Sequence, residues 1–307
     1  MRVAFMGTPA IAVPTLEKLY QQHDVVVVIT KPDKPTGRNL KITQSEIKEF
    51  ALLKKTPVIQ PTSLKDNQQL KNELEALSVD VVVVVAYGLI IPRWLIDIPP
   101  FGCINLHGSL LPEYRGAAPI QRAIMEGKST TGLTTMLIDE GMDTGDMLLE
   151  VEVRIEDDDN NGSLSKKMGQ AGADLVIETL EALKKGSILA VPQDDKKATH
   201  AEMIDKAEMK IDWNKKAIEI GRQVRALAPK PGAYTYMDGR RVKIFEVEAI
   251  DGDNAGPGEV VEIDGELIIA TGSGRLIILT LQPEGKKLMR GDEFIRGYQV
   301  KVGTAFQ

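Results

Sequence analysis

Cysteine, histidine and tryptophan are scarce in this chain. Its 307 residues include one cysteine, three histidines and two tryptophans. A single cysteine excludes an intrachain disulfide and a cysteine-based metal cluster, and Cys103 lies in the apolar run GCINL, where a buried, inert thiol is expected. We predict that no metal is bound, because one histidine without cysteine partners offers too few ligands for zinc.

Long hydrophobic runs and a strong excess of one charge are also absent. The longest apolar run, VVVVVA at 81–86, has the length of a strand and falls far short of the roughly 20 residues that cross a bilayer. The first residues, MRVAFMGTP, enter a strand pattern without the features of a secretory signal, so a cytoplasmic protein is expected. The net charge is -6, and basic and acidic residues number 16 each from Ile204 onward, so any contact with a nucleic acid must be local.

Short β-branched runs alternate with helical patterns over the first part of the chain. This alternation predicts an α/β fold with a doubly wound, mostly parallel sheet. A GxGxxG fingerprint is missing after the first strand, because Pro9 and Ile11 occupy its later positions, which argues against a nicotinamide or flavin cofactor. Helices are expected near residues 10–21, 44–54, 67–77, 117–126 and 162–184, the last one capped by Ser163 or Ser165.

The pattern changes after Lys185, where the chain becomes polar and loses its periodicity. We predict a catalytic domain at 1–187, a linker at 188–205 and a C-terminal domain at 206–307. In the last part, alternating strands are separated by Asp238-Gly239 and Asp264-Gly265, which are hairpin turn signals. Strands of this kind predict a small antiparallel β-barrel resembling the oligonucleotide-binding fold.

Asn105 and His107 are two residues apart in the sequence, at the end of the strand pattern CINL. Residues two apart on a strand point to the same side, and ligands of parallel sheets bind at the carboxyl ends of the strands. The pair could therefore face one pocket. The alternative is an asparagine that caps a turn and a histidine that is hydrogen-bonded to the backbone.

A second polar loop, IDEGMDTGDM at 138–147, strengthens the interpretation as a pocket. It holds Asp139, Glu140, Asp143 and Asp146, although acidic residues in turns are often only solvated. A histidine oriented by a carboxylate can transfer protons near neutral pH, and an amide can stabilise the oxyanion that forms when a carbonyl carbon becomes tetrahedral. The residues indicate acyl transfer without a covalent enzyme intermediate, since no serine or cysteine nucleophile is in a suitable setting. They do not select among the four acidic residues.

The stretches INLHGSLLPEYRGAAPIQRAI and DEGMDTGDML resemble those of the formyltransferases that use N10-formyltetrahydrofolate. The likeness extends through MRVAFMGTPAIAVPTLEKL, KPDKPTGR, VVVVVAYGLIIP and IDWNKKA, and so spans nearly the whole chain. It implies that Asn105, His107 and Asp143 are catalytic, and it implies 10-formyltetrahydrofolate as co-substrate. The folate-binding residues implied are Ser109, Leu110, Leu111, Pro112, Tyr87, Leu89, Ile90, Ile91 and Asp139.

A basic segment, TKPDKPTGRNLKITQS at 30–45, bears on the second substrate. A solvated loop would explain its charges, but the resemblance implies a loop that contacts methionyl initiator tRNA through Lys34, Arg38 and Lys41. The C-terminal domain would add a local basic stripe made of Arg222, Arg225, Lys230, Arg240, Arg241 and Lys243. The chain departs from the family near Lys230, where a tryptophan often stands.

The function expected is the formylation of methionyl initiator tRNA by a monomeric enzyme in translation initiation. Three other functions share some of these features. A formyltransferase acting on an amino sugar would use the same core residues, and a formyltetrahydrofolate hydrolase would use water as the acceptor. A non-catalytic RNA-binding module is the third, and the presence of Asn105, His107 and Asp143 argues against it.

Overall fold

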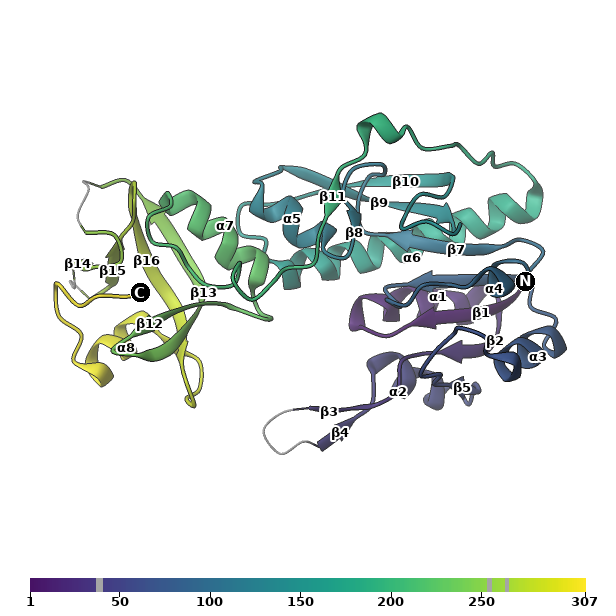
Figure 1. The fold of residues 1–307 in the computed structure, drawn as a ribbon, viewed down its shortest axis with the longest axis horizontal. Coiled ribbons are helices and arrows are strands. Elements are labelled where there is room, and N and C mark those ends of the chain that lie inside the picture. Colours follow the sequence, from purple (N-terminus) through teal and green to yellow (C-terminus); the bar gives the residue numbers. More distant parts are fainter. Residues whose placement is uncertain (37–40, 253–255, 263–264) are drawn as a thin grey trace. The chain divides into compact units, whose positions relative to one another are not determined.

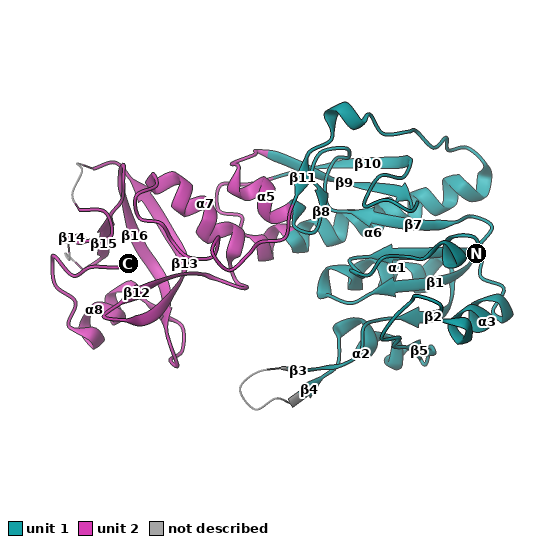
Figure 2. Cartoon of the chain, in the orientation of Figure 1, with its two compact units in different colours: residues 1–119, 130–154, 165–201 teal, residues 120–129, 155–164, 202–307 magenta. Residues whose placement is uncertain are grey.

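The structure, a computed structural model, describes residues 1–36, 41–252, 256–262 and 265–307. Their contacts divide the chain into two compact units, which Figure 2 colours separately. Unit 1 comprises 1–119, 130–154 and 165–201; unit 2 comprises 120–129, 155–164 and 202–307. The second unit therefore includes two short pieces from the middle of the sequence as well as the C-terminal part. Asp264 of the second predicted turn lies outside the described residues.

Unit 1 is built on a sheet whose strands, in the described part of the chain, follow the order β10-β9-β7-β6-β1-β2-β5 (Figure 1). β5, β2, β1, β6 and β7 are parallel, whereas β9 is antiparallel to β7 and β10 to β9. The strands are β1 (Arg2–Gly7), β2 (Asp24–Ile29), β5 (Val58–Ile59), β6 (Val81–Val85), β7 (Cys103–His107), β9 (Thr130–Leu137) and β10 (Met147–Arg154). This arrangement confirms the predicted fold class.

Helices cover both faces of this sheet, because its central strands are apolar on both sides. Val82 and Val84 of β6 belong to one core cluster with Leu70 and Leu74 of α3. On the opposite face, the long helix α6 approaches β7 so closely that a Cβ at Gly172 would lie 2.5 Å from the Leu106 side chain. The helices of unit 1 are α1 (Val13–Gln22), α2 (Glu46–Leu53), α3 (Gln68–Ala76), α4 (Arg93–Ile96) and most of α6 (Asn161–Lys185), with a 3-10 turn, η1 (Ala10–Ala12). Almost all of α5 (Pro119–Met125) belongs to unit 2.

Two local predictions can be compared with this structure. Cys103 is buried, and burial raises the pKa of its thiol to about 12, as expected of an inert group. The predicted cap of α6 was wrong. Asn160 caps the helix, because its Oδ1 accepts hydrogen bonds from the amides of Gly162 and Ser163, while the Ser163 hydroxyl bonds the Asp159 carboxylate instead. Of the helices in the described ranges, none has both the length and the apolar character needed to cross a lipid bilayer.

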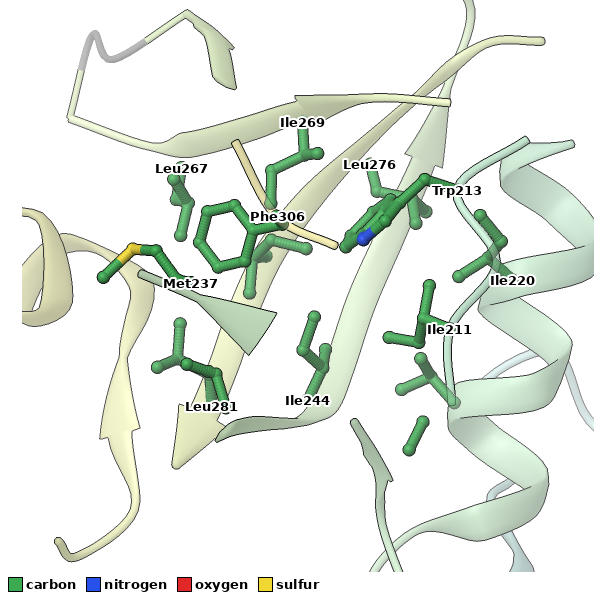
Figure 3. Packing of buried hydrophobic residues seen from close by; sticks show 14 of the residues in the cluster. Ile211, Trp213, Ile220, Met237, Ile244, Leu267, Ile269, Leu276, Leu281 and Phe306 are labelled. Carbon is green, nitrogen blue, oxygen red and sulfur yellow. The ribbon is translucent and has the colours of Figure 1, made fainter. Parts of the chain in front are cut away.

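Unit 2 contains an antiparallel sheet that curls around a hydrophobic core. Its described strands are β12 (Ala233–Met237), β13 (Arg240–Ile250), β14 (Val260–Glu262), β15 (Leu267–Ala270), β16 (Arg275–Pro283) and β17 (Met289–Arg290), accompanied by α7 (Ala217–Leu227) and α8 (Gly291–Tyr298). Trp213, Phe306, Ile244 and Leu276 point into the core in Figure 3. Asp238 and Gly239 turn between β12 and β13 with positive φ angles of 50° and 72°. The barrel-like C-terminal fold predicted from the sequence is confirmed.

Candidate active site

His107 is the last residue of β7, at the carboxyl end of the parallel strands. Its side chain is buried, with 5% of its surface exposed, and both ring nitrogens face polar atoms. Nε2 lies 2.9 Å from the carbonyl oxygen of Tyr114, and Nδ1 lies 3.6 Å from Oδ2 of Asp143. A carbonyl oxygen can only accept, so Nε2 carries a proton in the neutral ring and Nδ1 is the nitrogen with a free lone pair.

Asn105 lies two residues earlier on the same strand and is partly exposed. Strand alternation directs its side chain to the same side as that of His107. Within the described residues, the Asn105 amide has no hydrogen-bond partner from the protein. The amide therefore remains available to a ligand, and the turn-capping alternative for this asparagine is not what the structure shows. His107 does form a hydrogen bond to a backbone carbonyl, as the alternative expected of the histidine. Its other ring nitrogen also faces a carboxylate.

The structure distinguishes among the acidic residues of the second loop. Asp143 alone of the four forms an ion-pair contact with His107 in the described part of the chain, and its Oδ2 also accepts a hydrogen bond of 2.8 Å from the Gly116 amide. Asp139 stays within its own turn, accepting hydrogen bonds from the amide of Gly141 and the hydroxyl of Thr144. Asp143 adopts a left-handed conformation, with φ of 55°. This conformation is costly for a residue other than glycine, which indicates that surrounding contacts hold it.

The SLLP loop follows His107 and is held by Thr134 of β9. The Thr134 hydroxyl donates to the carbonyl oxygen of Ser109 and accepts from the amide of Leu111, at 2.8 Å and 3.0 Å. Ser109 is buried, and its hydroxyl donates to the carbonyl of Glu113. Leu111 is buried as well, whereas Leu110 and Pro112 are partly exposed. The loop therefore has a backbone shape that is specified by buried hydrogen bonds.

The loop after β6 presents apolar side chains to solvent. Leu89 and Ile90 are 38% and 82% exposed, while Ile91 and Tyr87 are buried. The Tyr87 hydroxyl has no hydrogen-bond partner in the described ranges, and burial raises its pKa to about 12. Exposed apolar residues beside a strand end form a surface that a flat, partly apolar ligand could cover.

The basic segment after β2 forms a small hairpin of β3 (Lys34–Thr36) and β4 (Lys41–Thr43). Arg38 lies outside the described residues, and of Lys41 only the backbone is described. Below the hairpin, Lys48 bonds both the Asp33 carboxylate and the Gln60 side chain, at 2.6 Å and 2.7 Å. The hydrogen bond from Lys48, and a second one of 2.8 Å from Gln60 Nε2, hold the pKa of Asp33 below its ordinary value. The same segment reaches the loop after β6, because Lys31 Nζ donates to the carbonyl of Gly88 at 2.9 Å.

Sequence reasoning missed a third group of residues near His107. The polar segment before β11 (His200–Ala201) runs beside the site, and β11 pairs with β8 (Arg115–Gly116). Gln193 and Thr199 from this segment bond the backbone of Asp143 and Tyr114. No signal in the sequence could have identified them, because the contacts join residues 50 and 85 positions apart in a segment without periodicity.

The basic residues expected to form a stripe in unit 2 differ in their surroundings. Arg225 is half-buried and donates to the carbonyl oxygen of Asp159 at 2.8 Å, so its charge has a role within the fold. Lys243 donates to the carbonyl of Pro231. Arg241 lies over the ring of Tyr234, with 5.9 Å between the guanidinium carbon and the ring centroid.

Comparison with protein families gives two matches that together cover most of the chain. Residues 1–180 match the model of the family described as formyl transferase. Residues 203–299 match the model described as formyl transferase, C-terminal domain. The first match alone covers more than half of the chain.

Full-length relatives are similar along the whole sequence. A methionyl-tRNA formyltransferase of Caldanaerobacter subterraneus subsp. tengcongensis is 45% identical over 306 residues, which cover 99% of both chains. A methionyl-tRNA formyltransferase of Carboxydothermus hydrogenoformans is 44% identical over 309 residues and covers both chains completely. Identity of this extent shows common descent along the whole chain, including both units.

A solved structure shares the fold at much lower identity. HypX of Aquifex aeolicus, in complex with tetrahydrofolic acid, has a TM-score of 0.66 and 18% identity to this chain. The similarity covers 98% of this chain and 48% of HypX. At this identity the comparison supports the fold and carries no residue assignment.

Proposed function

The chain belongs to the formyl transferase family, and we propose that it transfers a formyl group from 10-formyltetrahydrofolate to the α-amino group of methionyl initiator tRNA. The observation that carries the chemistry is the grouping of the Asn105 amide, His107 and the Asp143 carboxylate near the end of β7. The acceptor is supported by the full-length identity to methionyl-tRNA formyltransferases. Such an enzyme acts in translation initiation.

The residues around His107 fit a folate. The exposed side chains of Leu89 and Ile90 offer apolar cover, the buried Tyr87 hydroxyl is unpartnered within the described residues, and Asp139 lies in the loop that carries Asp143. Leu110 and Pro112 provide partly exposed surface on the SLLP loop, whose backbone is fixed by Ser109 and Leu111. When bound, the folate supplies a formyl group on N10 whose carbonyl carbon is open to attack by an amine.

Asn105 and His107 divide the work of the transfer. The amine forms a bond to the formyl carbon, the carbonyl oxygen gains negative charge, and the Asn105 amide donates a hydrogen bond to that oxygen. A donor of this kind contributes about 3 kcal/mol to the transition state. His107 accepts the proton that the amine loses and gives it to N10, so that the bond between N10 and carbon can break. Because Nε2 is bonded to Tyr114, Nδ1 is the atom that takes up this proton.

Asp143 stabilises the protonated form of His107. When Nδ1 gains a proton, the ring becomes a cation 3.6 Å from a carboxylate oxygen in a largely buried site. Attraction between opposite charges is stronger there than in water. The Gly116 amide keeps the carboxylate in place in both protonation states of the ring, since it bonds the same Oδ2.

The basic hairpin is the second part of the proposal. Lys34, Arg38 and Lys41 lie in the segment 30–45, whose Lys31 side chain donates a hydrogen bond to the Gly88 carbonyl in the loop after β6. Cations near the site would contact the phosphates of the acceptor end of a tRNA, and such contacts contribute affinity without reading sequence. We also propose that residues 206–307 form a tRNA-docking domain. The segment 188–205 connects it to the catalytic domain at 1–187, and part of that segment lies against the loops around His107.

The proposal is tested by supplying formyltetrahydrofolate with one acceptor at a time. The acceptors are methionyl initiator tRNA, an amino sugar nucleotide, and water alone. Radiolabelled formyl groups should appear on the α-amine of the methionyl-tRNA, with a turnover that greatly exceeds both other reactions. Formyl transfer only to the sugar would support the amino-sugar formyltransferase, and release of formate at the same rate with and without tRNA would support the hydrolase.

A further inference from the structure

The segment 191–201 runs along both loops that surround His107, and we name it the strap. We call the loop at 138–147, which carries Asp143, the acidic loop. Val191 exchanges two backbone hydrogen bonds with Met147, the last residue of this loop. Its other end pairs with β8, after the SLLP loop, through β11. The Thr199 amide also donates to the carbonyl of Pro112. One short stretch of chain is therefore hydrogen-bonded to both catalytic loops.

Tyr114 and Asp143, which provide the polar partners of the His107 ring nitrogens, share an unusual backbone conformation. Tyr114, whose carbonyl receives the Nε2 proton, has φ of 58°, and Asp143, whose carboxylate faces Nδ1, has φ of 55°. Left-handed conformations of this kind are costly for residues with a side chain and persist where other contacts hold them. The positions of the Tyr114 carbonyl and the Asp143 carboxylate therefore depend on the contacts that hold the backbone of these two residues.

Gln193 of the strap fixes the segment around Asp143. Its Nε2 donates to the carbonyl oxygens of Asp143 and Gly145, at 2.9 Å and 2.8 Å. Its Oε1 accepts a hydrogen bond of 2.9 Å from Arg115 Nε, which orients the amide so that the nitrogen faces the loop. Arg115 is buried and is held in turn by a bond of 2.8 Å to Asp195. The amide of Gln193 is therefore used completely, with its donors on the acidic loop and its acceptor on β8.

Thr199 fixes the segment around Tyr114. Its hydroxyl oxygen accepts a hydrogen bond of 2.8 Å from the amide of Tyr114. Its carbonyl oxygen accepts another from the amide of Arg115. Tyr114 is thereby held from the strap on one side while its own carbonyl holds His107 on the other.

We propose that Gln193 and Thr199 are positioning residues for formyl transfer, which act by holding Asp143 and Tyr114 in the left-handed conformations that His107 requires. This inference rests on the proposed function of His107. Neither strap side chain needs to touch a substrate in this role. Loss of either one should slow the chemical step and leave the binding of both substrates nearly unchanged.

The sharpest test replaces Gln193 by glutamate, which has the same shape and lacks the donor. A carboxylate oxygen would then face the carbonyls of Asp143 and Gly145 and displace the loop. The expected result is a kcat lowered about 10-fold to 100-fold, because small misplacement of a catalytic group has effects of this size, with KM values for tRNA and folate within about twofold. Lys197→Ala, an exposed change on the same segment, is the matched control and should leave kcat within about twofold. An unchanged kcat in Gln193→Glu would overturn the proposal for that residue.

Thr199 permits an isosteric pair of variants. Thr199→Val keeps the shape and removes the acceptor for the Tyr114 amide, and kcat should fall about fivefold, the factor that one hydrogen bond of ordinary strength carries. Thr199→Ser keeps the oxygen and should restore kcat to within about twofold of the unmodified protein. If serine and valine are impaired equally, the methyl group matters and the hydroxyl does not, which contradicts the proposal for Thr199.

A double-mutant cycle separates positioning from a general loss of structure. In single-turnover measurements, Gln193→Glu should cost far less in an Asp143→Ala background than alone, because the carboxylate that it positions is already absent. Equal losses in both backgrounds would show that Gln193 acts elsewhere. The proposed function fails separately: if the unmodified protein does not formylate methionyl-tRNA, that function is wrong, whereas normal formylation with an unaffected Gln193→Glu removes only the role of the strap.

Discussion

The loops around His107 and the basic hairpin of β3 and β4 all follow strands of the sheet in unit 1, but they are held in different ways. The ring of His107 contacts Tyr114 and Asp143, and the strap bonds the backbone of both. The hairpin strands pair with each other in a separate two-stranded sheet, and the Asp33, Lys48 and Gln60 cluster lies at their root. Contacts from distant parts of the sequence thus converge on the loops around His107, while the hydrogen bonds of the Asp33, Lys48 and Gln60 cluster lie at the root of the hairpin.

This difference matches what each region is proposed to do. Proton transfer requires donor and acceptor atoms within hydrogen-bond reach, so errors well below 1 Å matter at His107. Attraction between a lysine or arginine and a phosphate decreases slowly with distance and tolerates variable geometry. A site for chemistry therefore needs remote support, whereas a site for charge recognition needs only to present its cations on the correct side of the sheet.

The largest effect should come from the region that is held most firmly. We expect His107→Ala to lower kcat by at least about 100-fold, because the variant removes the group that accepts the amine proton and returns it to N10. Single-turnover formylation of methionyl-tRNA would measure this loss, and binding of both substrates should remain within about threefold. Thermal unfolding of the same variant serves as the control for folding.

Near-normal turnover by His107→Ala would show that the loops around His107 are not needed for proton transfer, and they would then not differ from the hairpin in the way proposed. Asn105 and the bound substrates would then suffice for the transfer, and the contacts that hold Tyr114 and Asp143 would need another explanation. A variant that is inactive and also unfolded would be replaced by His107→Gln, which keeps a donor for the Tyr114 carbonyl and cannot shuttle a proton.

The sequence predicted those features of the two regions that depend on local pattern. The valine run at 81–85 indicated a buried parallel strand, and the spacing of Asn105 and His107 placed both on one side of a strand end. The choice of Asp143 among four acidic residues came from family resemblance, because it depends on a left-handed backbone that no residue type in the loop requires. Gln193 and Thr199 could not be predicted, since a polar segment without periodicity gives no sign of where it is bonded.

The wrong prediction of the α6 cap also arose because the sequence does not specify which of several polar side chains forms a given hydrogen bond. Ser163 or Ser165 was expected to cap α6, but Asn160 directly precedes the helix and its side-chain oxygen accepts hydrogen bonds from two amides there. Several capping residues in a row satisfy the same rule, so the sequence leaves the choice to packing. The parts of the fold that were predicted correctly are those in which many residues repeat one signal.

An intermediate effect is expected from Arg38, which lies between β3 and β4 in the sequence. Arg38→Ala should raise KM for methionyl-tRNA about threefold to tenfold and leave kcat and the KM for folate almost unchanged, because one phosphate contact is lost. The slope of log KM against log salt concentration should become shallower by about one unit. Lys65→Ala, which removes one charge from an exposed position elsewhere in unit 1, is the matched control. A larger change in the KM for folate than for tRNA would assign the segment to the other substrate.

The smallest effect should come from Asp33 at the root of the hairpin. The direction in which its pKa is shifted predicts how its contribution to stability changes with pH. Lys48 and Gln60 bond the Asp33 carboxylate and lower its pKa below the ordinary value of 3.8. A lowered pKa in the folded state means that the ionised group stabilises the protein above its unfolded pKa, and that this stabilisation disappears as the pH falls through the folded pKa. Asp33→Asn should therefore lower Tm at pH 7 by about 2 °C or less, and the difference from the unmodified protein should shrink as the pH falls below about 4. A difference in Tm that stays constant down to pH 3 would show that the carboxylate charge plays no part, and the root of the hairpin would then be held by packing alone.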